Sequence, residues 1–194
     1  MPALSNTLSL VLAMLQLSFQ SLAKRLLPPG NPCKQAVLWL TILAVAGCGG
    51  AASVSERPLH GAGFTFSAPS SWQATRSGRE VRASKGLAVV AVTRYELLHR
   101  FRPEHWPTVV PELDRAAAGV ATQQAGMVAT AETITVAGQR ARRYEIDYER
   151  EGKRLVERIA FVLRAKTEYL LLCRYARGGD TRACERLLAT FRLT

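Results

Sequence analysis

The side chains best suited to chemistry are scattered along this sequence. The three histidines are His60, His99 and His105, and they lack the His-x-x-x-His spacing that holds zinc on a helix. The sequence contains no Cys-x-x-Cys pair, no Gly-x-Gly-x-x-Gly turn and no phosphate-binding loop. Ser70 and Ser71 lack the flanking glycines of a nucleophile elbow. We therefore expect no metal, no cofactor and no catalytic residue, and we predict that the protein is not an enzyme.

A row of carboxylates is the nearest approach to a cation site. Glu145, Asp147 and Glu149 alternate with other residues, which would place them on one face of a β-strand. One interpretation is an acidic stripe that binds a cation. The other, which we favour, is a set of cross-strand ion pairs. Arginines surround the stripe in the sequence: Arg140, Arg142, Arg143 and Arg150.

Covalent modification is the second kind of chemistry, and it centres on Cys48. An apolar run over 36–46 follows Lys24, Arg25 and Lys34, which are the only charges before Cys48. A basic segment, an apolar core of about 7–15 residues and small residues after it make the pattern of a secretory signal. The run is shorter than the roughly 20 apolar residues that a membrane-spanning helix needs. The pattern therefore predicts export.

The segment Val45-Ala46-Gly47-Cys48 resembles the lipobox of bacterial lipoproteins. The resemblance implies cleavage before Cys48 and attachment of fatty-acyl chains, such as palmitate, to that residue. Two or more chains anchor a protein stably, whereas one chain gives only marginal membrane binding. The alternative is an ordinary signal peptide, or an uncleaved anchor, with an incidental cysteine. We expect a protein of the cell envelope that is lipid-anchored to the membrane and faces the periplasm or the cell exterior.

We predict that the chain consists of a signal peptide, a flexible tether and one folded domain. Residues 1–47 are predicted to be a lipoprotein signal peptide with an unusually long N-terminal extension. The uncharged stretch 1–23 indicates a start codon assigned too early, or else a second membrane segment diluted by serine and glutamine. Small and polar residues over 48–62 predict a flexible tether. Residues 63–194 are enough for one domain with its own core.

The exported part is basic. The whole chain has a net charge of +11, and removing Lys24, Arg25 and Lys34 from its 26 basic residues leaves 23 against 15 acidic ones, or +8. No block of five or six like charges occurs, so we interpret the surplus as solvated surface. Attraction to anionic lipid, acidic glycans or a phosphate-rich wall polymer is the alternative. We expect an envelope protein or an anionic polymer as partner, and no nucleic acid.

Two cysteines remain in the exported part, Cys173 and Cys184. Disulfides persist in exported compartments, so we predict a bridge between them. It would close a loop of about ten residues, worth up to roughly 3 kcal/mol in the chain-entropy model. The alternative is two buried thiols, because cysteine packs as a small hydrophobe.

Apolar and polar residues alternate along most of 63–194, which predicts strands, and two stretches have the composition of helices. The helices are expected near 111–121 and 182–189, with Asp180 or Thr181 as the cap of the second. Turns of hairpin length indicate an antiparallel sheet, so the fold class is α+β. The expected strands are 63–67, 73–76, 80–83, 87–95, 128–136, 140–149, 155–163, 169–175 and a short 191–193. The segment 103–107 is expected to break regular structure, and 166–168 is expected to be a turn.

The domain resembles the Mog1/PsbP-like fold. The resemblance rests on the opening Phe64, Phe66, Pro69 and Trp72, on the turn within 135–141, and on the closing segment 183–191. It implies an α-β-α sandwich around an antiparallel sheet. Many bacterial members of this fold are lipoproteins of undefined role, others are accessory, assembly or chaperone-like proteins, and the family has no shared catalytic residues to transfer.

These observations predict a membrane-anchored envelope lipoprotein with a non-catalytic binding, accessory or assembly role. An envelope hydrolase with a non-contiguous active site is the alternative. A deep pocket in which a serine or carboxylate meets a histidine would favour the hydrolase. A shallow groove with apolar and arginine walls would favour the binding role.

Overall fold

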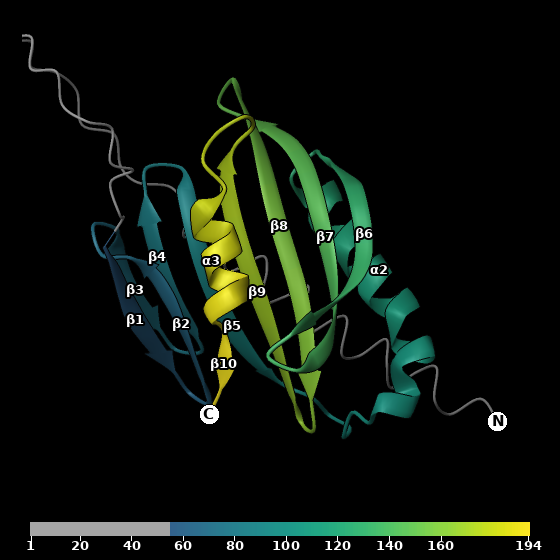
Figure 1. Ribbon diagram of the computed structural model, residues 1–194. Coiled ribbons are helices and arrows are strands. Elements are labelled where there is room, and N and C mark those ends of the chain that lie inside the picture. The colour runs from purple at the N-terminus through teal and green to yellow at the C-terminus, as the bar shows by residue number, and fades with distance from the viewer. Residues whose placement is uncertain (1–54) are drawn as a thin grey trace, which may run out of the picture.

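The computed structural model describes residues 55–194, which form two antiparallel β-sheets and two α-helices (Figure 1). The fold class is α+β, as predicted. The predicted signal peptide, most of the predicted tether and Cys48 lie outside the described residues. Within residues 55–194, no helix is long and apolar enough to cross a membrane.

A seven-stranded sheet forms the body of the molecule, in the order β3-β4-β5-β9-β8-β7-β6. Every neighbouring pair in it is antiparallel, as the hairpin-length turns predicted. Its central strands are the most apolar, because both of their faces are covered. The strands are β3 (Gln73–Ser77), β4 (Glu80–Lys85), β5 (Ala88–Glu96), β6 (Met127–Val136), β7 (Gln139–Arg150), β8 (Lys153–Arg164) and β9 (Thr167–Ala176).

A three-stranded sheet in the order β1-β2-β10 packs beside it. The strands are β1 (Glu56–Gly61), β2 (Phe64–Pro69) and β10 (Arg192–Leu193). The prediction of a tether through residue 62 is wrong for β1, which pairs with β2 along its whole length. The prediction failed because β1 is an edge strand held chiefly by backbone hydrogen bonds, and only Leu59 packs against the core.

The first α-helix begins earlier than predicted. A short 3₁₀ helix, η1 (Pro103–His105), leads directly into α2 (Trp106–Gln123). The expectation that 103–107 breaks regular structure is therefore wrong, since Pro107 lies in the first turn of α2, where a backbone N–H has no partner to lose. Trp106 is buried and meets the edge of the Phe101 ring. The second helix, α3 (Arg182–Thr190), lies where the sequence predicted it.

The two helices cover opposite faces of the large sheet (Figure 1). Helix α2 packs over β6 and β7, where Asp114 accepts hydrogen bonds from the Tyr144 hydroxyl at 2.7 Å and from Arg142 Nε at 3.0 Å. Helix α3 and the small sheet enclose a second core on the other face, built around Phe64, Phe66 and Phe191. The result is a sandwich with the large sheet as its middle layer.

The layer that contains α3 covers only part of its face of the sheet. In Figure 1, α3 crosses in front of β9, and α2 lies behind β6 and β7. Among residues 55–194, no helix lies over β6, β7 and the adjoining part of β8 on the α3 side.

A candidate binding face on the large sheet

The uncovered part of the sheet carries charged side chains instead of apolar ones. We call it the open sheet face. Its residues are Thr130 and Glu132 on β6, Arg143, Glu145 and Asp147 on β7, Arg158 on β8, and Arg177 just after β9. On the opposite face the same strand β7 presents Tyr144, Ile146 and Tyr148, all buried against α2. The alternation of β7 therefore separates a packed side from a solvated one.

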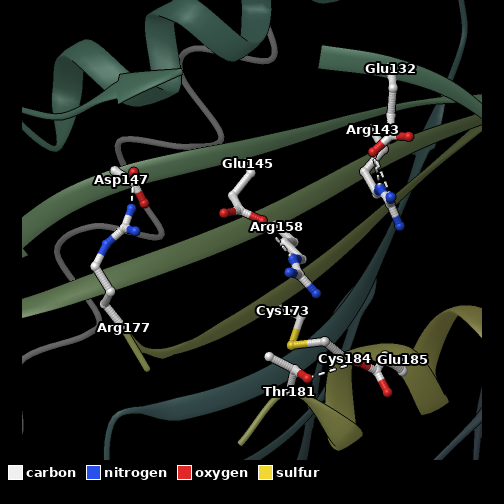
Figure 2. Close-up of polar contacts among 10 residues, drawn as sticks. All are labelled: Glu132, Arg143, Glu145, Asp147, Arg158, Cys173, Arg177, Thr181, Cys184 and Glu185. Atoms are coloured by element: carbon white, nitrogen blue, oxygen red, sulfur yellow. Dashed lines mark hydrogen bonds and ion pairs between the residues drawn. A yellow bond between two sulfur atoms is a disulfide. The ribbon is translucent and has the colours of Figure 1, made fainter. Parts of the chain in front are cut away.

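Three ion pairs run across the open sheet face (Figure 2). Arg143 Nε donates to Glu132 Oε1 at 3.0 Å, and Arg158 Nε donates to Glu145 Oε2 at 2.8 Å. Asp147 pairs with Arg177. Glu145 is thus in a cross-strand pair, which is the interpretation that the sequence favoured over a cation site, whereas Asp147 pairs with an arginine that follows β9. Neither partner is among the four arginines that surround the stripe in the sequence.

The sheet register brings the first two pairs together. Arg143 lies directly opposite Glu132, and Glu145 lies directly opposite Arg158. Directly opposed side chains in an antiparallel pair are within reach of one another. Counting equal steps back from the turns at 137–138 and 151–152 would have located both pairs from the sequence. The partner of Asp147 follows a different strand, so no such count reveals Arg177.

Arg158 is held on two sides. Its guanidinium lies over the Tyr175 ring, 5.2 Å from the ring centre, in addition to its hydrogen bond to Glu145. Burial opposes the charge on Arg158, but the hydrogen bond to Glu145 and the negative groups around it raise its pKa above the ordinary value. Arg158 therefore presents a fixed positive charge beside α3.

A disulfide forms the border between the open sheet face and α3. Cys173 on β9 and Cys184 on α3 are bonded, with their Cα atoms 5.4 Å apart, and both are buried. The sequence prediction of this bridge is confirmed. Figure 2 shows the disulfide beside Arg158, with Thr181 and Glu185 of the α3 N-terminus close by. The bridge fixes the helix that closes one side of the face.

The histidines lie on separate segments. His60 is in β1, His99 is in the loop after β5, and His105 ends η1. All three are exposed. Within residues 55–194, no group of three or more histidine, cysteine, aspartate and glutamate side chains is placed to hold a metal ion. The predicted lipid site, Cys48, lies outside these residues.

Comparisons with known proteins identify the fold alone. No family model matches the chain, and no curated protein matches its sequence. Solved structures do match. The chain is similar to the cyanobacterial PsbP (CyanoP) of Synechocystis, with a TM-score of 0.54 and 14% identity over 77% of this chain and 98% of that one. It also matches a protein of Bacteroides thetaiotaomicron, with a TM-score of 0.51 and 11% identity over 68% of this chain.

The chain spans only 45% of the length of that Bacteroides protein. A third match, LpqN of Mycobacterium tuberculosis, described as involved in cell envelope biogenesis, has a TM-score of 0.42 and 12% identity over 72% of this chain and 91% of that one. That TM-score is too low to support any argument. From the first match and the layers described above, the fold is α+β and PsbP-like, with an antiparallel sheet flanked by helices.

Proposed function

We propose that this protein is a lipid-anchored accessory protein of the bacterial cell envelope, and that it binds a partner protein through the open sheet face without catalysing a reaction. The signal-like segment that ends in Cys48 supports the location. The buried Cys173–Cys184 disulfide fits the same compartment, because such bonds persist in exported proteins. The PsbP-like fold agrees with a role in binding.

The observation that carries the binding role is the row of paired charges on an uncovered sheet. Ion pairs at the protein surface contribute only about 0–1 kcal/mol to stability, and the side chains of these three pairs are all partly exposed, so the fold itself gains little from this row. Aligned charges of both signs contribute more to the choice and orientation of a partner. The pairs at 132–143 and 145–158 also hold long side chains in fixed positions, which lowers the entropy lost on binding.

Site-specific photo-crosslinking in cells tests the proposal. A photoreactive residue replaces Thr130, which is exposed at the edge of the open sheet face, in the full-length chain. The matched position is Ala118, which is exposed on α2. We expect a defined crosslinked protein from position 130 and none from position 118.

Charge reversal then ties the crosslink to the surface. Arg143→Glu should abolish the crosslink from position 130, because it places two carboxylates opposite each other on the face. Arg115→Glu is the control, since Arg115 belongs to another exposed pair, with Glu112 on α2. No crosslink from position 130, or one that survives Arg143→Glu unchanged, would contradict the proposed binding face.

A further inference from the structure

A pocket lies at the end of the sheet where the chain turns from β6 to β7. It has a volume of about 500 Å³ and a mostly polar lining. The walls come from three parts of the chain, namely the turn between β6 and β7, the last residue of β8, and β10. The lining residues are Ala137, Gly138, Gln139, Arg164, Arg192 and Leu193.

The two arginines of the pocket differ from those of the open sheet face. Arg143, Arg158 and Arg177 each have a carboxylate partner. Within residues 55–194, Arg164 and Arg192 have no carboxylate within 4.0 Å, and the pocket lining contains no acidic residue. The pocket therefore gathers two positive charges that have no direct ion-pair partner among residues 55–194.

The guanidinium of Arg192, which is an exposed residue, is held by two backbone hydrogen bonds. Its Nη1 donates to the carbonyl oxygens of Ala189 at 2.9 Å and Phe191 at 2.7 Å. These bonds use one nitrogen of the guanidinium and leave Nε and Nη2 for another acceptor. A guanidinium held in this way loses less entropy when it binds an anion.

The turn adds neutral donors to the pocket. Ala137 and Gly138 both have positive φ, at 49° and 73°, which is the geometry of a tight two-residue hairpin turn. Their N–H groups donate to no other backbone group among the described residues. The Gln139 side chain carries a further amide donor beside them.

We propose that this pocket binds a phosphate group, with Arg164 and Arg192 as the two guanidinium donors and Gln139 as a neutral one. Planar guanidinium groups match the spacing of phosphate oxygens and bind them with paired hydrogen bonds. The phosphate belongs either to a lipid headgroup or to a soluble phosphate compound. The inference is independent of the partner proposed for the open sheet face, because purified protein alone suffices to test it.

The position of the pocket bears on the source of the phosphate. Strand β1 begins at Glu56 and ends at Gly61, and Gly61 pairs with Phe64, which in turn pairs with Leu193 of the pocket. Five steps of a strand cover about 17 Å. The pocket thus lies at the far end of the small sheet from residue 55, away from the side where the predicted tether joins the domain. This favours a soluble phosphate compound.

Calorimetric titration of the purified full-length protein in detergent tests the proposal. Two probes separate the sources. Inorganic phosphate represents a soluble phosphate compound, and the soluble diester glycerophosphoglycerol represents a phospholipid whose acyl chains have been removed. Sulfate at the same ionic strength serves as the control anion. We expect dissociation constants in the millimolar range or below for phosphate. Tighter binding of either phosphate probe than of sulfate supports the pocket, and the tighter of the two identifies the source.

Matched variants locate the binding. R164Q/R192Q should weaken phosphate binding by at least about tenfold, because it removes both charged donors. R79Q/R100Q makes the same charge change at two exposed arginines that have no carboxylate within 4.0 Å among the described residues, and it should bind as the parent does. Gln139→Ala keeps the pocket charge and should weaken binding less, so it tests the site even where the double variant unfolds.

Three results would overturn the proposal. They are binding of neither phosphate probe, sulfate binding as tight as that of phosphate, and equal loss of phosphate binding in R164Q/R192Q and in R79Q/R100Q. The last of these would mean that the net charge of the molecule, and not the pocket, attracts the anion.

Discussion

Glu168 is a carboxylate buried without a partner. It lies on β9 between Tyr95 and Leu163 on the neighbouring strands, it is only 3% exposed, and its Oε1 has no hydrogen-bond partner among the described residues. Burial raises the pKa of Glu168 from 4.5 to about 7, because the charged form cannot be solvated there. The sequence predicted a turn over 166–168, whereas the structure places Glu168 in β9, inside the sheet.

Stability should therefore fall as the pH rises through the window between these two pKa values. Below about pH 4.5 the folded and unfolded chains both hold the proton. Between about pH 4.5 and 7 only the folded chain holds it, and above that range the folded chain contains a buried charge. The expected loss in the free energy of unfolding is about 3 kcal/mol. Glu168→Gln should remove this loss when urea unfolding is followed across the window.

Glu149→Gln is the control for that measurement, because Glu149 is exposed on β7. It should leave the pH profile of stability almost unchanged. If the parent and Glu168→Gln lose stability in parallel as the pH rises, Glu168 does not carry the buried charge.

The buried ion pair of Arg174 and Glu157 is a second feature that sequence reasoning missed. Arg174 Nε donates to Glu157 Oε2 at 3.1 Å, and Gln124 Nε2 donates to Glu157 Oε1 at 3.0 Å. Both members of the pair are almost fully buried. Arg174→Met should lower the free energy of unfolding by about 3–5 kcal/mol, because it leaves the buried carboxylate of Glu157 without its ion-pair partner.

The double variant Glu157→Met/Arg174→Met should recover much of that loss, since two well-packed apolar side chains can replace a buried ion pair. Urea unfolding of the single and double variants measures the difference. A single variant no less stable than the double one would show that Glu157 does not depend on Arg174.

At the scale of elements, the Cys173–Cys184 bond connects α3 to the strand that precedes it. The chain between them turns through Gly178, which has φ of +76° and so adopts a conformation that other residues rarely reach. C173A/C184A should lower the free energy of unfolding by roughly 2–3 kcal/mol. Amide hydrogen exchange should speed up first in α3, because the helix is short and otherwise held mainly by Leu187 and Phe191.

Hydrogen exchange at Leu113 and Ala117 of α2 provides the reference for that experiment, because α2 packs on the opposite face of the sheet. Exchange in α2 should change little in C173A/C184A. Equal acceleration in both helices would mean that the bridge stabilises the whole domain instead of docking α3.

Most strands and the last helix could be predicted from the sequence. Apolar and polar residues alternate clearly where one face of a strand is buried and the other is exposed to solvent. Strand β7 is the clearest case, because its alternation indicated which of its side chains face solvent, although the partners of Glu145 and Asp147 lie on other elements. Strand β1 could not be predicted, because its backbone pairs with β2 while its side chains bury little. The early start of α2 was hidden by Pro103 and Pro107, which the first turns of a helix tolerate.

The charged pocket could not be predicted because its parts are far apart in the sequence. Arg164 ends β8 and Arg192 begins β10, and only the packing of the small sheet against the large one brings them together. Net charge gave the one available signal. The sequence analysis interpreted that charge as solvated surface. This interpretation fits the arginines that form ion pairs better than it fits Arg164 and Arg192.

At the scale of the whole molecule, the two faces of the large sheet have different roles. Helix α2 closes one face with an apolar core, while α3 and the small sheet close part of the other. The remainder is the open sheet face, and the arginine pocket lies at the end of the sheet where β6 turns into β7. The binding role that we propose in the envelope relies on this surface and requires that the chain is exported and anchored.

Metabolic labelling with a fatty acid, followed by membrane fractionation, tests that central claim most directly. The parent protein should take up the label and sediment with membranes, and Cys48→Ser should lose the label and leave the membrane fraction, because Cys48 is the proposed site of acylation. Cys33→Ser is the control, since Cys33 precedes the predicted cleavage point and should not affect labelling. An unlabelled parent, or a Cys48→Ser protein that still takes up fatty acid, would contradict the account of a lipid-anchored envelope protein.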